Sequence, residues 1–517
     1  MSLFCIAPLY TVSVSRQKSL FTLTVFCNSK ERERNNIFSS DITITGLMKI
    51  AFIHYHLKKG GVTTVLKHQV EALREECEIL VLSGELPDMS FLADVVHIPG
   101  LGYDSQSQKE YKPEKVADDI IKAVFSKWNN GCDVLHVHNP TLAKNTNLLK
   151  ILKALQKRGI KLFLQIHDFA EDGRPLSYFS EEYVSDCHYG VINSRDYNIL
   201  LKAGLKKQGL HKIFNTIKPI DSDKKKSYTK NYVLYPIRAL RRKNIGEAIL
   251  LSLFFSNNET LVITLPPNSI SDIISYVGWK NFVRENNLDV EFEADLKNDF
   301  SELVLSAKFI ITTSITEGFG FSFLEPWTAK KILLGRKLPD ICHDFEKNGI
   351  RLDHLYNRIP VPLEWIGKDK FYEVWKACIL RNCFLFNFKI NEEKIQKSFT
   401  KITENNNIDF GLLYEPFQKQ IISYVLSSKN KAKKLIRLNP YLSCPANGLL
   451  NNNELIQNNM NAVLNNYNKT TYRKNLLEIY SKIINNSVNQ SIDKNILLSE
   501  FINLEQFSLL KWNDYAE

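Results

Sequence analysis

The sequence has little that would suit a membrane-spanning or disulfide-bonded protein. Its 517 residues contain no uninterrupted apolar run that approaches the roughly 20 residues of a transmembrane helix. The nine cysteines are scattered singly, and neither a Cys-x-x-Cys pair nor the His/Cys spacing of a zinc site occurs. Dispersed cysteines of this kind indicate reduced thiols. We therefore expect a cytoplasmic protein.

Two common phosphate-binding motifs are also missing. There is no P-loop, and the dinucleotide fingerprint G-x-G-x-x-G, which could begin at Gly318 and Gly320, fails at Phe323. Glycine and proline are sparse, with 21 and 17 residues, which excludes a collagen-like chain. A hydrophobic fraction of 44% excludes a largely disordered chain. The protein is therefore globular, and its length suits two or more domains.

The charge is unbalanced toward the positive side. Lys and Arg number 67 against 56 Asp and Glu, which gives a net charge of +11. Residues 205–243 alone contain twelve basic residues and two acidic ones. Nucleic-acid binding would need a regular interleaving of aromatic residues with these cations or a known motif, and we find neither, so we expect no nucleic-acid partner. Peripheral contact with an anionic membrane stays open.

Short apolar runs alternate with helical patterns from Met48 onward. This alternation predicts an α/β protein whose parallel sheets are covered by helices on both faces. Strands are expected at 50–53, 78–82, 134–137, 162–166, 190–193, 232–237, 261–265, 290–292 and 309–313. The charged stretch 221–230 lacks apolar periodicity and is predicted to link two alternating blocks. We therefore expect a disordered extension at 1–47, two doubly wound domains at 48–222 and 223–427, and a helical tail packing back on the body at 428–517.

Glycines and cations follow two of the predicted strands. Gly60 and Gly61 precede a helix, so their backbone N–H groups could approach a phosphate at its positive end. Arg238 and Lys243 follow strand 232–237, where cations can neutralise negative charge that develops on a leaving diphosphate. Taken alone, the first pair also suits a turn, and the second a solvated basic loop.

Two carboxylates follow a third strand. Glu317 lies in the loop after strand 309–313, and Glu325 lies in the helix that comes next. A carboxylate at such a place can accept hydrogen bonds from sugar or ribose hydroxyls. Glu325 could instead be an acidic residue favoured by the dipole at a helix start.

Histidines end two strands of the first block. His167 and Asp168 follow strand 162–166 in a run rich in charge, which is hard to explain as core. His136 and His138 alternate along strand 134–137 and therefore share one face of the sheet. Neutral histidines that support the site or the core suit this pattern better than a metal centre, so we expect no metal.

These features, in this order, resemble the retaining glycosyltransferases of family four, which have the GT-B fold. The resemblance covers roughly residues 48–430 and implies two Rossmann-like domains facing across a cleft. It implies that Gly60, Gly61, Arg238 and Lys243 serve the donor diphosphate, and that Glu325 binds the ribose. It makes His167 and Glu317 active-site residues beside the donor sugar, with Asp168 as a further catalytic candidate. His136, His138 and the loop residue Asn215 match positions that face the acceptor or support the site.

The implied activity is transfer of a sugar, as by a hexosyltransferase, from a nucleotide-diphosphate sugar to an acceptor hydroxyl with retained configuration. Cations and helix ends replace a divalent metal in such sites, so neither a metal nor a cofactor is expected. The acceptor could be a saccharide, a small polar molecule or a lipid-linked sugar. One departure is Pro326-Trp327, where similar proteins have a Gly-containing stretch. The alternatives are a nucleotide-sugar epimerase of the same fold and a non-catalytic carbohydrate-binding subunit.

Overall fold

The computed structural model describes residues 46–87, 91–106, 109–220, 231–256, 258–443 and 448–513. The predicted extension at 1–47 therefore lies almost wholly outside the described residues, and the predicted linker at 221–230 lies wholly outside them. Residues Leu47–Glu517 form one compact unit. Within the described ranges, no helix has the length and apolar character needed to cross a membrane.

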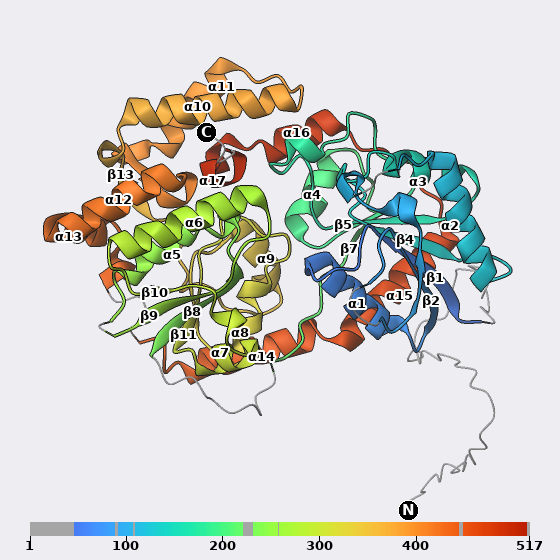
Figure 1. Cartoon of the computed structure of the whole chain (residues 1–517), viewed down its shortest axis with the longest axis horizontal. Coiled ribbons are helices and arrows are strands. Elements are labelled where there is room, and N and C mark those ends of the chain that lie inside the picture. Colours follow the sequence, from blue (N-terminus) through green and yellow to red (C-terminus); the bar gives the residue numbers. More distant parts are fainter. Residues whose placement is uncertain are drawn as a thin grey trace, which may run out of the picture. The chain divides into compact units, whose positions relative to one another are not determined.

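The first half of the unit carries a sheet of seven strands that all pair in parallel. The strands follow the order β3-β2-β1-β4-β5-β6-β7, which is doubly wound about β1 and β4. Their bounds are β1 Met48–His54, β2 Cys77–Ser83, β3 Asp94–His97, β4 Val134–His138, β5 Leu162–Ile166, β6 His188–Val191 and β7 Leu210–Lys212. The intervening helices are α1 Gly61–Leu73, α2 Pro113–Lys127, α3 Leu148–Lys157 and α4 Ser194–Lys202 (Figure 1).

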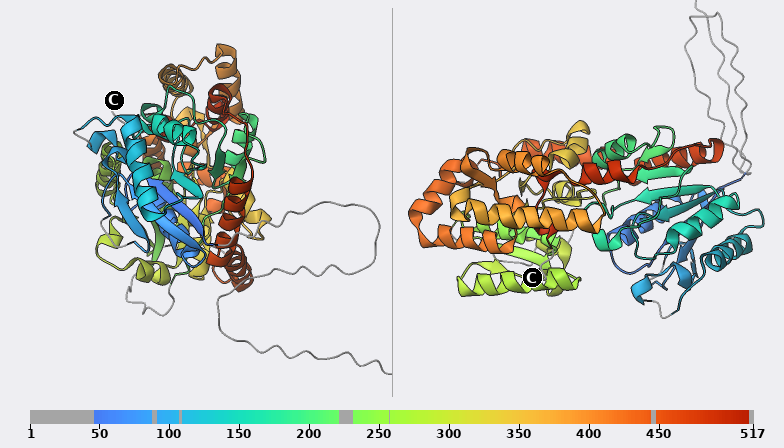
Figure 2. Two further views of the ribbon diagram at one scale, coloured as in Figure 1. Left: turned by 90° about the vertical axis from the view of Figure 1, so that its right-hand side faces the viewer. Right: turned by 90° about the horizontal axis from the view of Figure 1, so that it is seen from above.

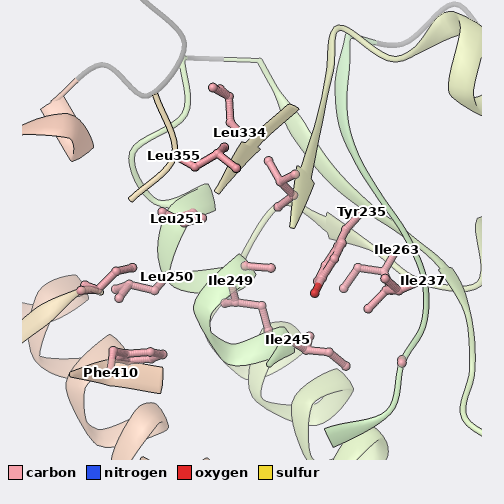
Figure 3. Close-up of a cluster of buried hydrophobic side chains, with 14 of the residues drawn as sticks. Tyr235, Ile237, Ile245, Ile249, Leu250, Leu251, Ile263, Leu334, Leu355 and Phe410 are labelled. Carbon is pink, nitrogen blue, oxygen red and sulfur yellow. The ribbon is translucent and has the colours of Figure 1, made fainter. Parts of the chain in front are cut away.

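The second half carries a parallel sheet of five strands in the order β10-β9-β8-β11-β12. The strands are β8 Tyr232–Arg238, β9 Thr260–Leu265, β10 Val290–Glu291, β11 Phe309–Thr312 and β12 Leu333–Gly335. The helices among them are α5 Ile245–Ser252, α6 Ile270–Glu285, α7 Phe300–Ser306, α8 Glu325–Thr328 and α9 Pro339–Lys347. Figure 3 shows side chains of β8 and β9 packed against those of α5 in the buried core. This packing holds the carboxyl end of β8 in place.

The rest of the chain is mostly helical. Two short strands in this region, β13 Pro360–Pro362 and β14 Asn407–Asp409, form an antiparallel pair. The helices are α10 Lys368–Leu385, α11 Glu392–Ile402, α12 Glu415–Ser427, α13 Lys429–Leu438, α14 Asn453–Asn466, α15 Lys469–Asn485, α16 Lys494–Phe501 and α17 Leu509–Trp512. Helix α15 returns to the first half, where Leu476 and Tyr480 join the same buried cluster as Phe52. Figures 1 and 2 show this orange-red helix beside the blue elements of the first sheet.

Candidate active site

Two histidines meet where β4 and β5 end. His138 is the last residue of β4 and His167 follows β5, and the parallel pairing places these strand ends side by side. His138 Nδ1 lies 2.8 Å from His167 Nε2, so the two rings share one hydrogen bond. Burial lowers the pKa of His167 to about 4, and burial with its histidine neighbours lowers the pKa of His138 as well. Both rings are therefore neutral at pH 7.

Asn139 fixes the backbone of the His167 loop, and sequence reasoning missed it. Its Oδ1 accepts hydrogen bonds from the backbone N–H groups of His167, at 2.8 Å, and Asp168, at 3.0 Å. Its own φ is 53°, in the left-handed region that asparagine tolerates better than most residues. An asparagine directly after a strand that ends in His-x-His was the signal available in the sequence.

Asp168 is ionised and is held by two arginines. Arg174 Nη2 donates to Asp168 Oδ1 at 2.7 Å. Burial opposes ionisation of this carboxyl, but the charges of Arg174 and Arg242 outweigh it and hold its pKa at about 2. Because Arg242 belongs to the second half, this electrostatic interaction joins the loop after β5 to the loop after β8.

Glu317 lies against two cations that follow β8. Lys243 Nζ donates to Glu317 Oε1, and Arg242 Nη1 lies 3.5 Å from Glu317 Oε2. Burial raises the pKa of Glu317, but Lys243 and Arg242 reverse this effect and lower it overall. Burial also lowers the pKa of Lys243 more than Glu317 raises it. Lys243 and Glu317, which were predicted separately for the diphosphate and for the donor sugar, therefore contact each other, and Arg242 of the same basic run joins them.

Arg238 lies at the end of β8 and makes a different contact. Its Nη1 donates to the carbonyl oxygen of Pro266, at 3.0 Å, and no acid of the described residues pairs with it. Arg241, in the same basic run, is used structurally, because its Nε and Nη2 donate to both carboxylate oxygens of Glu415. Arg238 thus has no acidic partner within the part of the chain that the structure describes.

Glu325 is a carboxyl group without a hydrogen-bond partner among the described residues. It is the first residue of α8, where its backbone N–H group and the helix dipole favour negative charge. Burial nevertheless raises its pKa to about 7, and the charge of Lys243 offsets only part of that effect. A half-buried carboxyl next to a cation, with no hydrogen-bond partner among the described residues, is a place that a hydroxyl donor of a ligand can fill.

Direct contacts bring the two loops together. A Cβ added to Gly318, the residue after Glu317, would lie 3.3 Å from the carbonyl oxygen of His167. Asn193 Nδ2, at the start of α4, donates to the Gly318 carbonyl oxygen at 2.7 Å. The predicted catalytic set of His167, Asp168 and Glu317 is therefore gathered in one place.

The other predicted residues lie farther along the first half. His136 is fully buried, with Nε2 on Gln165 Oε1 and Nδ1 on the hydroxyl of Tyr480, both at 2.9 Å. Asn215 is buried, and its Oδ1 has no partner among the described residues. His136 therefore lies in the interior of the first half, next to the site, and does not reach it.

Gly60 and Gly61 are exposed, and the structure gives no internal reason for glycine at either position. Gly60 has an extended φ of −174°, which any residue can adopt. An added Cβ at Gly61 would meet nothing within 4 Å, and at Gly60 only the Lys58 carbonyl oxygen at 3.9 Å. The space in front of the α1 N-terminus is open to a ligand.

No group of three or more His, Cys, Asp or Glu in the described ranges is arranged to hold a metal ion. The absence of a metal requirement stays a prediction.

Comparison with known proteins gives the class of enzyme. No family model matches the sequence. The chain is 26% identical over 424 residues to mannosylglucosyl-3-phosphoglycerate synthase of Petrotoga mobilis, an alignment that covers 74% of this chain and 82% of the relative. Among solved structures it is similar to sucrose-phosphate synthase from Thermosynechococcus elongatus, with a TM-score of 0.50 and 12% identity, covering 84% of this chain and 99% of that one.

A further similar structure is that of HepE from Anabaena in complex with UDP-glucose, with a TM-score of 0.48, 12% identity, and coverage of 84% of this chain and 99% of that one. The likeness to sucrose-phosphate synthase confirms the predicted GT-B fold. The Petrotoga relative, aligned over most of the chain, identifies it as a glycosyltransferase, which confirms the predicted class of enzyme.

Proposed function

We propose that this GT-B glycosyltransferase transfers a hexosyl group from a nucleotide-diphosphate sugar to a hydroxyl of a phosphorylated, anionic glycoside, with retention of configuration. One observation carries the proposal. Arg242, Lys243 and Glu317 of the second half meet Asp168 and His167 of the first half, so a cationic site for a leaving diphosphate faces neutral and acidic groups for a sugar.

The donor would bind to the second half. Arg242 and Lys243 supply the positive charge for the diphosphate, with Arg238 beside them at the end of β8. Glu325, which has no partner among the described residues, accepts the ribose hydroxyls. Lys243 already contacts Glu317, so a bound diphosphate shares this cation with the carboxylate and loosens the pair. No metal or cofactor is part of this scheme.

The reaction would use charge more than covalent chemistry. The bond between the anomeric carbon and the phosphate oxygen breaks, and positive charge develops on the sugar ring. The acceptor oxygen attacks from the same face, and its proton passes to the departing phosphate oxygen. Lys243 and Arg242 stabilise the negative charge on that phosphate, whereas Glu317 and Asp168 stabilise the positive charge on the ring. His167, neutral at pH 7, hydrogen-bonds a sugar hydroxyl.

An anionic acceptor is supported by the comparison with a known enzyme. The name of the Petrotoga relative, which says that it makes mannosylglucosyl-3-phosphoglycerate, supports a phosphorylated glycoside as the class of acceptor and a mannosyl group as the hexose.

A ligand panel tests the donor. We expect one of UDP, GDP or ADP, or its mannose or glucose derivative, to raise the melting temperature of the enzyme, because a ligand at 100 times its Kd stabilises by about 2.7 kcal/mol. The Lys243→Ala variant should lose most of this stabilisation at the same ligand concentration. Equal stabilisation of the variant would contradict the role of Lys243 in holding the diphosphate.

Product analysis tests the transfer. With the donor found above and glucosyl-3-phosphoglycerate, NMR of the product should show a new glycosidic bond of the same anomeric configuration as the donor. A neutral or lipid-linked saccharide accepted in its place would change the acceptor class. Conversion of the nucleotide sugar without any acceptor would identify an epimerase, and binding without turnover a carbohydrate-binding subunit.

A further inference from the structure

The last described residues, 507–513, form a short segment that is anchored in the second half. The backbone carbonyl of Phe507 accepts a hydrogen bond from Trp375 Nε1, at 3.3 Å, and that of Trp512 accepts one from Asn382 Nδ2, at 2.9 Å. Ser508 Oγ donates to the Gly411 carbonyl oxygen at 2.7 Å. We call residues 507–513 the terminal segment. Its position is set by buried contacts of the second half.

From this position the terminal segment reaches the loop that carries the predicted catalytic residues of the first half. Lys511 Nζ forms an ion pair with the carboxylate of Asp172, and the two side chains are only 15% and 14% exposed. The contact is close along the lysine side chain as well, because a Cβ added to Gly173 would lie 3.2 Å from Lys511 Cγ. Lys511 therefore holds residues 168–174, which begin with Asp168 and directly follow His167.

The same segment contacts the basic run on the donor side. Arg241 Nη1 donates to the carbonyl oxygen of Asn513. Arg241 directly precedes Arg242 and Lys243, and its guanidinium is itself fixed by Glu415. One short segment thus touches the loop of Asp168 on one side and the residues next to Lys243 on the other.

We propose that Lys511 is a positioning residue, which through Asp172 sets where the loop 168–174 places His167 and Asp168 relative to Glu317. This inference rests on the proposed function, since it assigns Lys511 to the same site. At its other end the loop is fixed by Arg174 on Asp168 and by Asn139 on the backbone of His167. Besides the charge of Arg242 on Asp168, Lys511 adds a direct ion pair between this loop and the terminal segment.

The test compares Lys511→Met with the double variant Lys511→Met/Asp172→Asn. The single variant leaves a buried carboxylate without its lysine and can fold poorly, whereas the double variant removes both charges. In the double variant we expect kcat to fall on the order of 10²-fold, because a displacement of about 1 Å at the reacting groups has that effect. The Kd for the bare nucleotide should stay unchanged. The Lys511→Arg variant, which keeps the positive charge, should retain most of the wild-type turnover.

Lys202→Met is the matched control. Lys202 Nζ pairs with Glu500 at 2.8 Å, so it also links a late helix to the first half, but it touches no residue of 168–174. We expect wild-type kcat from this variant. An equal loss of kcat in Lys202→Met, or wild-type kcat in a folded double variant, would overturn the proposal.

Amide hydrogen exchange gives a readout that needs no activity. In the double variant, exchange in residues 168–174 should speed up at least tenfold, while exchange in β5 itself should not change. Unchanged exchange in the loop would refute positioning by Lys511 whatever the kinetics show. If the wild-type enzyme transfers no sugar, the proposed function fails, and the exchange experiment still decides the role of Lys511.

Discussion

Glu317 and Glu325 are the same residue type a few residues apart, and their surroundings move their pKa values in opposite directions. Glu317 is buried and Glu325 is half-buried, and desolvation raises the pKa of both carboxyl groups. At Glu317 the charges of Lys243 and Arg242 reverse the effect and lower its pKa. At Glu325 Lys243 compensates only in part, and the pKa rises to about 7. Glu317 is therefore ionised before any ligand binds, whereas the ionisation of Glu325 depends on pH near neutrality.

This difference predicts a pH dependence of nucleotide binding. Ribose hydroxyls donate to the ionised carboxylate, so binding favours deprotonated Glu325. At pH 6, one unit below its pKa, the free enzyme holds this group mostly protonated, and the nucleotide Kd should be about tenfold weaker than at pH 8. Calorimetric titrations at pH 6, 7 and 8 measure this change.

The control is Glu325→Gln, which removes the titrating group and keeps the size of the side chain. The phosphates of the nucleotide titrate in the same range and act on both proteins alike, so the difference between the two pH profiles isolates Glu325. Identical profiles for wild type and Glu325→Gln would show that another group causes the dependence, and that Glu325 does not meet the ribose.

Much of the element order could be predicted from the sequence. The apolar runs at 134–137 and 162–166 become β4 and β5 almost unchanged, because strands buried on both faces leave a plain signal. β3 and β7 were not predicted, since one is a half-exposed edge and the other has three residues. The strand predicted at 190–193 begins and ends two residues earlier, because the side chain of Asn193 accepts a hydrogen bond from Asp196 N and caps α4.

The residues of the candidate site also differ in whether the local sequence could predict them. Residues in the loop that follows a strand, such as His167 and Glu317, could be found because their position is local. The roles of Arg242 and Tyr480 depend on partners 75 and 344 residues away, Glu317 and His136, and no spacing rule reaches so far. Lys511 was missed for the same reason, since its partner Asp172 is 339 residues distant.

The start of α1 gives a prediction at the scale of one element. Gly61 is the first residue of the helix, and alanine would fit there without a clash. Gly61→Ala should therefore stabilise the protein by about 0.5–1 kcal/mol, since alanine favours the helix and restricts the unfolded chain. If the N–H groups of this turn approach a donor phosphate, the added methyl group obstructs it and turnover should fall on the order of tenfold.

Thermal unfolding and kinetics on the same preparation separate the two effects. A rise in melting temperature together with lower turnover is the expected pair of results. Higher stability with wild-type turnover would mean that no ligand comes close to this turn. A fall in stability would contradict the structure itself, because it would reveal a contact that the open space in front of Gly61 does not contain.

At the scale of the whole molecule, three contacts join the two halves beside the candidate site. Asn193 donates to the backbone beside Glu317, and Lys511 pairs with Asp172. A third contact joins α4 to α9, where the carboxylate of Asp344 accepts hydrogen bonds from the backbone N–H and the hydroxyl of Ser194. Each contact lies within or next to the loops of the candidate site. The free energy that holds the two halves together and the geometry of the site therefore depend on the same residues.

Asp344 allows this dependence to be tested. Its side chain is 3% exposed, and Lys212 Nζ lies 3.4 Å from it and 2.5 Å from Ser194 Oγ. Asp344→Ala leaves the Ser194 N–H group and the Lys212 charge without their acceptor, so the free energy of unfolding should fall by about 2–4 kcal/mol. Asp344→Asn keeps one oxygen for Ser194 and should lose less.

Urea unfolding of these variants and of Asp353→Ala measures the effect. Asp353 is exposed, and its loss should change the free energy of unfolding by no more than about 0.5 kcal/mol. If the contact between the two halves sets the geometry of the site, Asp344→Asn should also lower kcat and leave the nucleotide Kd nearly unchanged, because Arg242, Lys243 and Glu325, which we propose to hold the nucleotide, belong to the second half. Wild-type kcat in a destabilised Asp344→Asn would mean that the halves keep their catalytic geometry without this contact, and that the loops beside Glu317 alone determine it.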